Sequence, residues 1–335
     1  MNTEEILPLL RDAGLITGEA RVTPLAGGVS SDIALIESAQ GKIVVKAALE
    51  KLRVKDDWFA DVARNRVEQD YFDYAANIIP RSVPRILGSG PGWFAMEYLG
   101  DMPNWKSQLL AGNIELSTAQ LAGEVLGRLH GASWLDPVAR DRFATLPNFH
   151  ALRIEPYLLT TAARVPEAAE FLRREAAMLA QTRLALVHGD YSPKNLLTGP
   201  QRLVVLDAEC AWFGDPAFDV AFMLSHLLLK ALLHRDTTRL VPEFWFAYAH
   251  GLELMRESHD ASTDSSVKFL GNSTLRSFAA LETRMTRLLL CLLLARVHGK
   301  SPVEYLSDDQ RAHVTRFVLA RLPEPPPFPV LVKAW

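Results

Sequence analysis

The sequence predicts an α+β protein with two unequal lobes: a small β-rich lobe with one long helix over residues 1–98, and a larger, mostly helical lobe over residues 99–335. Short apolar runs separated by turn residues dominate the first part and are typical of strands. From Leu99 onward, apolar residues recur three or four positions apart, as in helices. One β-like island, Leu184–Leu206, interrupts the helical pattern. A chain of 335 residues is long enough to form two compact units.

Four strand-like runs and one helix make up the predicted N-terminal lobe. The helix covers Asp57–Ala76, where large apolar residues repeat at roughly helical spacing. The turn Ala39-Gln40-Gly41 joins the first two strands, and Gly88-Ser89-Gly90-Pro91-Gly92 is interpreted as a turn between the last two, because no helix follows these glycines. The strands are Ile33–Ile36, Lys42–Ala47, Val83–Leu87 and Trp93–Tyr98.

The C-terminal lobe is predicted to be helical on both sides of the β island. Its first helix runs from Ser117 to Trp134, with Ser117 as the N-cap. Proline-rich Pro323–Pro329 is expected to be extended along the surface. Further helices are expected at about 153–181, 216–233, 241–258, 274–298 and 308–321.

Composition narrows the function classes. Apolar residues make up 49% of the chain, charged residues 22%, and the net charge is −3, which argues against nucleic acid or an anionic membrane as the main partner. The two cysteines, Cys210 and Cys291, are too few for a disulfide framework. No secretory signal pattern opens the chain, and Leu288–Ala295, the longest apolar run, is far shorter than the ~20 residues of a membrane span. We therefore expect a cytoplasmic protein.

The chemistry is concentrated around His188-Gly189-Asp190. Asn195 follows Asp190 after five positions, and the apolar run 203–206 leads into Asp207. Phosphoryl transfer needs one carboxylate to accept the proton of the incoming hydroxyl and oxygen ligands to hold Mg²⁺ against the phosphates. We interpret Asp190 as that proton acceptor. His188 is expected to hold the loop's shape through hydrogen bonds, because Asp190 already fills the role of base.

Oxygen ligands for Mg²⁺ follow on the same segment. Asn195 and Asp207 supply the amide and carboxylate oxygens that this ion prefers. Glu209 lies two residues further on. It is a candidate for a second metal or a metal-bound water, and equally for an ordinary surface carboxylate.

The nucleotide's other contacts are expected in the N-terminal lobe. Lys46 closes an apolar strand, a costly position unless an anion is nearby, and Glu68 on the following helix is its natural ion-pair partner, with Glu50 as the competitor. The backbone carbonyl of Glu97 and the N–H of Leu99 lie where they would meet an adenine edge. A turn ahead of the first hairpin strand offers backbone N–H groups to phosphates through Gly27, Gly28, Ser30 and Ser31.

Six features of the chain resemble protein-kinase motifs and occur in the same order. They are the glycine turn, the strand lysine, the helix glutamate, the Met-Glu-Tyr-Leu segment, His-Gly-Asp-x-x-x-x-Asn and Asp-x-Glu. His-Gly-Asp and Asp-Ala-Glu are similar to the aminoglycoside phosphotransferase family, which includes choline, methylthioribose and homoserine kinases. The resemblance covers about residues 20–230, and Asp-x-Glu is closest to the methylthioribose kinases. It implies a protein-kinase-like fold that binds ATP and Mg²⁺ between its lobes.

That resemblance also implies residue roles. Asp190 would be the catalytic base, Asn195 and Asp207 the metal ligands, and Lys46, paired with Glu68, the group on the α- and β-phosphates. Asp219, in a segment similar to the family's helix-start motif Gly214-Asp215-Pro216, would brace the catalytic loop. Only seven residues separate Asp207 from Asp215 and no Ala-Pro-Glu follows, so there is no room for a protein-kinase activation segment.

The acceptor is the least defined part of this prediction. Val241–Trp335 holds 11 Lys and Arg against 10 Asp and Glu, so no acidic wall for a polycationic aminoglycoside is evident. We expect a small hydroxylated metabolite, with Arg284, Arg287 and Trp212 as candidate substrate contacts. Alternatives that stay open are an aminoglycoside phosphotransferase, a non-catalytic nucleotide-binding regulator, and a kinase acting on acyl-CoA or protein.

Overall fold

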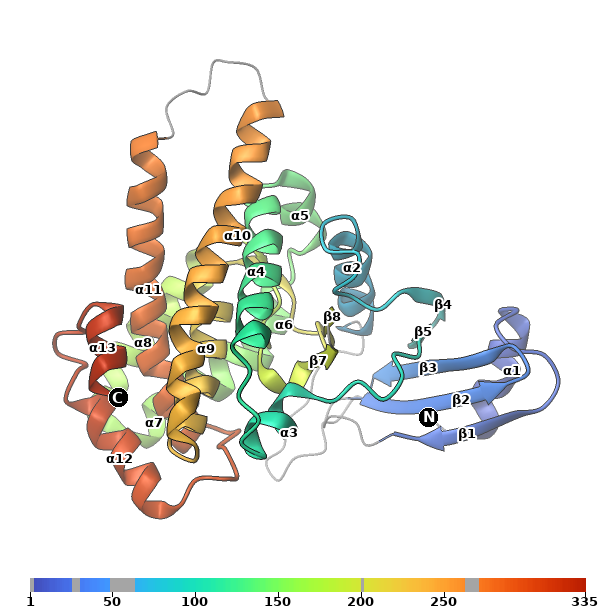
Figure 1. The fold of residues 1–335 in the computed structure, drawn as a ribbon, viewed down its shortest axis with the longest axis horizontal. Coiled ribbons are helices and arrows are strands. Elements are labelled where there is room, and N and C mark those ends of the chain that lie inside the picture. The colour runs from blue at the N-terminus through green and yellow to red at the C-terminus, as the bar shows by residue number, and fades with distance from the viewer. Residues whose placement is uncertain (1–2, 26–30, 49–63, 200–201, 263–270) are drawn as a thin grey trace.

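The computed structural model describes residues 3–25, 31–48, 64–199, 202–262 and 271–335. Its two lobes are unequal, as Figure 1 shows: a twisted sheet with two helices lies at one end, and a body of packed helices lies at the other. No helix in these ranges combines the length and the apolar character that a bilayer crossing needs.

A five-stranded antiparallel sheet forms the N-terminal lobe, in the order β1-β2-β3-β5-β4. In the part of this lobe that the structure describes, the helices α1 (Thr3–Asp12) and α2 (Arg64–Ala76) cover the sheet. Alternation along β3 decides which side chains face each helix: Val45 belongs to the apolar cluster with α1, whereas Val44 belongs to the cluster with α2. Lys46 therefore faces α2. The strands are β1 (Ala20–Pro24), β2 (Ser31–Ser38), β3 (Gly41–Ala48), β4 (Ile86–Gly90) and β5 (Trp93–Glu97).

The glycine cluster corrects one prediction. Gly88 to Gly90 are not part of a turn but belong to β4, which pairs with β5, and only Pro91 and Gly92 form the hairpin turn. Glycine is needed at position 90 because a Cβ there would lie 2.5 Å from Nε1 of Trp93, the residue paired with it. The predicted helix 57–76 is described only from Arg64, where α2 begins.

Helices dominate the C-terminal lobe. Among its described residues, four short strands pair as β6 (Ala185–Val187) with β9 (Trp212–Gly214), and β7 (Leu196–Gly199) with β8 (Arg202–Val205). A π-helical segment, His150–Leu159, precedes α7. The α-helices are α3 (Trp105–Leu110), α4 (Leu116–Ala132), α5 (Pro137–Arg142), α6 (Leu146–Phe149), α7 (Thr160–Arg164), α8 (Ala169–Gln181), α9 (Ala217–Ala231), α10 (Leu240–Ser262), α11 (Gly271–His298), α12 (Asp308–Leu319) and α13 (Phe328–Ala334).

Two further predictions are corrected in this lobe. The N-cap of α4 is Glu115, so Ser117 lies inside the first turn. The proline-rich tail is not extended throughout, because α13 begins at Phe328 with Pro329 in its first turn, where a proline costs no hydrogen bond. Burial of Phe328 and Leu331 against the helical core explains why this segment folds back.

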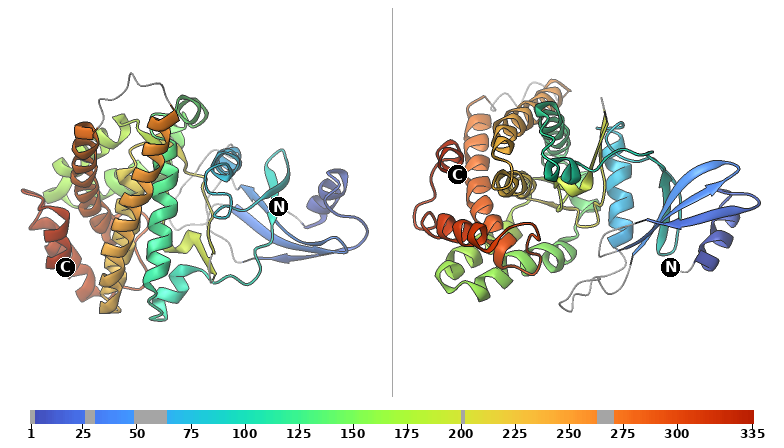
Figure 2. Two further views of the ribbon diagram at one scale, coloured as in Figure 1. Left: turned by 45° about the horizontal axis from the view of Figure 1, so that its top comes forward. Right: turned by 60° about the horizontal axis from the view of Figure 1, so that its bottom comes forward.

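Helix α4 packs closely on α10 beside the loop that holds His188, Gly189 and Asp190, the candidate catalytic loop. The two helices run side by side in Figure 1 and in the two views of Figure 2. Gly123, Gly127 and Gly131, four residues apart on α4, form a stripe that lies directly on the backbone of α10. Any larger side chain in the stripe would meet backbone atoms. The contact brings Tyr248 of α10 within reach of α4's His130, whose Nδ1 lies 3.1 Å from the Tyr248 hydroxyl.

Candidate active site

Lys46 stands between two carboxylates that come from different parts of the chain. Its Nζ lies 2.7 Å from Oε2 of Glu68 on α2 and 2.6 Å from Oδ1 of Asp207, which follows β8. Burial alone would lower the pKa of Lys46, but the two carboxylates more than offset it and raise that pKa. Burial raises the pKa of Glu68 to about 7 against the opposing pull of Lys46. The lysine is thus held as a cation at the junction of the lobes.

Asp207 has a backbone conformation that few non-glycine residues adopt. Its φ is +66°, in the left-handed region, where aspartate and asparagine are the best-tolerated side chains. A backbone hydrogen bond stabilises the turn on its N-terminal side: the N–H of Leu206 donates to the carbonyl of Asn195 at 2.9 Å. Such strain costs on the order of 1–3 kcal/mol and is concentrated at functional sites. Here it directs the carboxylate at the end of β8 toward Lys46.

The catalytic loop is held by Asp219 at the start of α9. One carboxylate oxygen accepts the N–H of His188 at 2.6 Å, and the other accepts the N–H of Gly189 at 2.9 Å. Gly189 has a φ of +79°, and a Cβ there would lie 2.6 Å from the carbonyl oxygen of Cys210. His130 of α4 lies behind the carboxylate, with Nε2 at 3.3 Å. The shape of the loop therefore depends on the fully buried carboxylate of Asp219.

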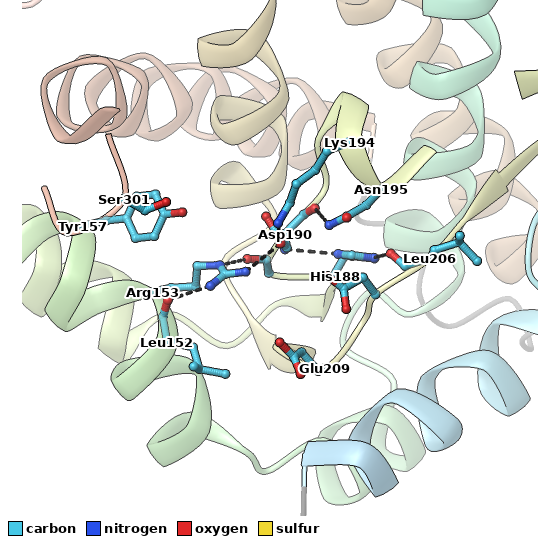
Figure 3. A network of polar contacts seen from close by, with 12 residues as sticks. Leu152, Arg153, Tyr157, His188, Asp190, Lys194, Asn195, Leu206, Glu209 and Ser301 are labelled. Atoms are coloured by element: carbon cyan, nitrogen blue, oxygen red, sulfur yellow. Dashed lines mark hydrogen bonds and ion pairs between the residues drawn. The ribbon is translucent and has the colours of Figure 1, made fainter. Parts of the chain in front are cut away.

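Both ring nitrogens of His188 are occupied within the loop (Figure 3). Nδ1 accepts the N–H of Asp190 at 3.1 Å, so Nε2 carries the proton and donates to the carbonyl of Leu206 at 3.1 Å. Burial lowers the pKa of His188, which keeps the ring neutral. The imidazole thus ties Asp190 to the β8 turn and has no free nitrogen to act as a base.

Asp190 is 3% exposed and pairs with two cations that motif reasoning did not identify. Its Oδ2 lies 2.9 Å from Nη2 of Arg153, in the π-helical segment, and 2.8 Å from Nζ of Lys194. Burial alone would raise the pKa of Asp190, but these two charges lower it further than burial raises it. Arg153 also donates through Nε to the carbonyl of Gly189. The carboxylate is therefore ionised at neutral pH and able to accept a proton.

Asn195 and Glu209 flank this carboxylate (Figure 3). The Asn195 amide nitrogen donates to the backbone carbonyl of Asp190 at 2.9 Å, which leaves the amide oxygen as the atom suited to a metal. Glu209 is buried, and its backbone carbonyl accepts a bond from Asn148 at 2.7 Å. In the described ranges no three His, Cys, Asp or Glu side chains form a ready-made metal cage. This donor set fits Mg²⁺, because that ion usually takes only one or two protein carboxylates and completes its shell with phosphate oxygens and water.

Comparison with known proteins identifies the family of this chain. A family model described as the phosphotransferase enzyme family matches residues 21–258. The chain belongs to this family. Methylthioribose kinase from Yersinia pseudotuberculosis serotype O:3 (strain YPIII) is 26% identical over 223 residues, which cover 56% of this chain and 53% of the relative. A methylthioribose kinase from Pectobacterium atrosepticum is also 26% identical, over 226 residues. The chain spans about half the length of the curated relatives it matches.

Solved structures show that this phosphotransferase-family chain has the kinase-like fold. An amicoumacin kinase, in complex with AMP-PNP, Ca²⁺ and Ami, superposes with a TM-score of 0.60 at 15% identity, covering 98% of this chain and 97% of the other. Choline kinase from Cryptosporidium parvum Iowa II gives a TM-score of 0.57 at 14% identity, covering 94% and 95%. The predicted α+β fold with two lobes is confirmed.

The expected adenine and phosphate contacts are only partly described. Gly27, Gly28 and Ser30 lie outside the described residues, as does Glu50, and Ser31 is the buried first residue of β2. Glu97 ends β5, and its Oε1 lies 2.9 Å from Nη2 of Arg202 at the start of β8, so its side chain joins the two lobes. Leu99 follows in the half-buried connection. Their contacts to a nucleotide stay predictions.

The three candidate substrate residues have partners within the protein itself. Arg284 forms a two-point ion pair with the buried carboxylate of Asp215, at 2.8 and 3.2 Å. Arg287 lies 2.5 Å from Oε1 of Glu175 and packs over a ring of α8. Trp212 is 0% exposed and stacks on Phe149, with ring centroids 4.5 Å apart. The prediction for Trp212 is therefore wrong, because a fully buried ring offers no surface to a substrate.

Proposed function

We propose that this chain transfers the γ-phosphoryl group of ATP to a hydroxyl group of a small-molecule metabolite. The observation that carries the proposal is the meeting of Lys46, from the N-terminal lobe, with the segment that holds Asp190 and Asp207, far along the chain, at the junction of the lobes. Lys46 touches Asp207 at 2.6 Å, and Asp207 and Asp190 influence each other's electrostatic environment. Support comes from the relatives, which are named as kinases of small molecules.

Each residue has a distinct task in the proposed reaction. The ionised carboxylate of Asp190 orients the acceptor hydroxyl and takes its proton as the oxygen bonds to the γ-phosphorus. The bond between that phosphorus and the β–γ bridging oxygen breaks, and ADP leaves. Lys46 holds the α- and β-phosphates. Mg²⁺, bound by Asp207 and Asn195, would neutralise charge on the phosphate oxygens.

Lys194 and Arg153 extend this mechanism beyond the motif. Because Lys194 ends 2.8 Å from the Asp190 carboxylate and its side chain is 48% exposed, it is placed to reach a transferring phosphoryl group. Arg153 is buried and contacts the same carboxylate oxygen, Oδ2 of Asp190. We assign Lys194 to the phosphoryl group and Arg153 to positioning the base.

A coupled ADP-release screen over sugars, sugar acids, sugar phosphates, amino alcohols, nucleosides and aminoglycosides tests the proposal. With an active acceptor, Asp190→Asn should lower kcat by about a thousandfold or more and leave ATP affinity nearly unchanged, because the base acts only on the hydroxyl. Asp141→Asn, an exposed residue of α5, is the matched control and should keep full activity. Equal loss of ATP affinity in Asp190→Asn would contradict the assignment of Asp190 as base.

A further inference from the structure

A second group of charged side chains lies beside the catalytic loop, and neither the family motifs nor the mechanism above uses it. We call His226, Lys230, Arg296 and Tyr305 the cationic cluster. They come from α9, from α11 and from the connection between α11 and α12. Three of the four carry basic groups, and His226, Lys230 and Arg296 are each at least nine-tenths buried.

Lys230 is the unusual member. Its side chain is 0% exposed, and its nearest polar contacts are long: the Tyr305 hydroxyl at 3.4 Å and the carbonyl of His226 at 3.5 Å. Within the described part of the chain it has no ion pair, and the nearby carboxylate of Glu304 pairs instead with Lys106 of α3, at 2.5 Å. A buried ammonium without an anion is costly, and the carbonyls of the last turn of α9 offset only part of that cost.

Arg296 adds an unused donor to the same place. Its Nη1 donates to the backbone carbonyl and hydroxyl of Ser301, the latter at 3.0 Å, and reaches the Tyr157 hydroxyl at 3.4 Å. Its Nε is buried and has no hydrogen-bond partner in the ranges that the structure describes. An arginine held on one edge and open on the other suits a further acceptor, because its donors form a rigid fork.

A continuous chain of contacts links the cationic cluster to the catalytic base. The Tyr157 ring lies 5.8 Å from the guanidinium carbon of Arg296 and 5.7 Å from that of Arg153, which holds Asp190. The ring of Phe222 is 5.2 Å from that of His226. Figure 3 shows Tyr157 and Ser301 together on the Arg153 side of Asp190. The cluster is therefore joined to the Arg153 side of Asp190 through the rings of Tyr157 and Phe222.

Electrostatics supports an anion at this point. Burial lowers the pKa of Lys230 to about 7, and the charges of Arg296 and Lys106 act in the same direction against the weaker pull of Glu304. Burial also lowers the pKa of His226, and Lys230, Arg296, Lys194 and Lys106 lower it further. A bound anion would attract these cations and raise the pKa values of Lys230 and His226 again. Strongly shifted basic groups next to a catalytic loop are typical of functional sites.

We propose that the cationic cluster binds a compact oxyanion of the phosphate acceptor, a carboxylate or a phosphate ester, and so selects anionic hydroxylated metabolites over neutral or cationic ones. This inference rests on the proposed kinase function. The oxyanion stays unchanged through the reaction: the proton moves from the acceptor hydroxyl to Asp190, and ADP carries away the electrons of the broken phosphorus–oxygen bond. Polycations are disfavoured because they meet like charge.

Paired acceptors test the substrate class. We would compare kcat/KM for glycerol with glycerate and glycerol 3-phosphate, and for ribose with ribonate and ribose 5-phosphate. The expected result is at least a tenfold higher kcat/KM for an anionic member of each set. The anion with the higher kcat/KM shows whether the cluster binds a carboxylate or a phosphate ester. Lys230→Met should remove the preference, whereas Lys300→Met, a control lysine 3.0 Å from Oε2 of Glu155, should keep it. Preference for the neutral members, or an unchanged preference in Lys230→Met, would overturn the proposal.

Anion binding without turnover gives an independent measurement. With the nucleotide site saturated by AMP-PNP, inorganic phosphate or malonate should raise the Tm of the wild type and of Lys300→Met but not of Lys230→Met. Lys230→Met should itself be at least as stable as the wild type, because it removes a buried unpaired cation. Arg296→Met is the second variant if that expectation fails. No anion effect on the wild type would sink the inference, whereas anion binding with no phosphoryl transfer to any acceptor would overturn the kinase function alone.

Discussion

Replacing Asp219 with asparagine tests whether the catalytic loop depends on a carboxylate outside the motif. Asp219 is fully buried and accepts two backbone N–H groups, from His188 at 2.6 Å and Gly189 at 2.9 Å. Asparagine has nearly the same shape and keeps one oxygen. Its NH₂ group, however, would face the second backbone N–H, and two donors cannot bond. One hydrogen bond is lost and one buried N–H is left unpaired.

The expected cost follows from these contacts. A hydrogen bond to a charged group contributes about 1.5–3 kcal/mol, and an unsatisfied buried donor costs about 1–3 kcal/mol. Asp219→Asn should therefore lose about 2.5–6 kcal/mol of unfolding free energy, which corresponds to a Tm lowered on the order of 10 °C. Loop displacement matters more for catalysis, because a misplacement of about 1 Å at reacting groups costs about a hundredfold in rate. We expect kcat to fall by that factor while ATP affinity changes little.

Thermal unfolding and ADP release, measured on the same samples well below the Tm, check this prediction. Asp136→Asn is the matched control, because Asp136 also accepts two backbone N–H groups, from Val138 at 3.0 Å and Ala139 at 3.2 Å at the start of α5. That variant should lose about 0.5–2 kcal/mol of stability and keep its kcat. Wild-type turnover in folded Asp219→Asn, or an equal loss of turnover in Asp136→Asn, would refute the reasoning.

Three further predictions follow from packing and charge. Gly127→Ala should lower the Tm even though alanine is the better helix former by about 1 kcal/mol, because the new methyl meets the α10 backbone; calorimetry decides the sign. Lys46→Met should abolish phosphoryl transfer. Without Lys46, the pKa of Glu68, which burial already raises, should rise further. Protonated Glu68 therefore stabilises this variant at low pH, and that stability is lost as pH rises through the new pKa in denaturant titrations. Cys210 and Cys291 are buried with raised pKa values, so thiol reagents should label them only after unfolding.

The central residues of the candidate site could be predicted from the sequence, because most of them are close together along the chain. Asp190, Asn195 and Asp207 lie within one loop and the hairpin that follows it, so their spacing almost determines their geometry. Lys46 was recognisable because a lysine that closes an apolar strand needs an anion, and the structure places both Glu68 and Asp207 against it. The long helices α4, α9, α10, α11 and α12 followed from apolar periodicity for the same reason, because a repeat of three to four residues is a local property. The predicted helix 153–181 is instead divided between a π-helical segment, α7 and α8.

Packing between distant segments decided the rest. Arg153 reaches Asp190 from a π-helical segment 37 positions earlier, and no motif marks it. The sequence analysis interpreted Trp212 as a possible substrate contact, yet Trp212 is buried where β9 pairs with β6. The cationic cluster exists only because α9 and α11 meet there. Which helix faces meet depends on how side chains fit across the whole core. The charge environment, burial and partners at these positions are therefore set by the tertiary structure. The order of the candidate catalytic groups along the chain is a property of the sequence alone.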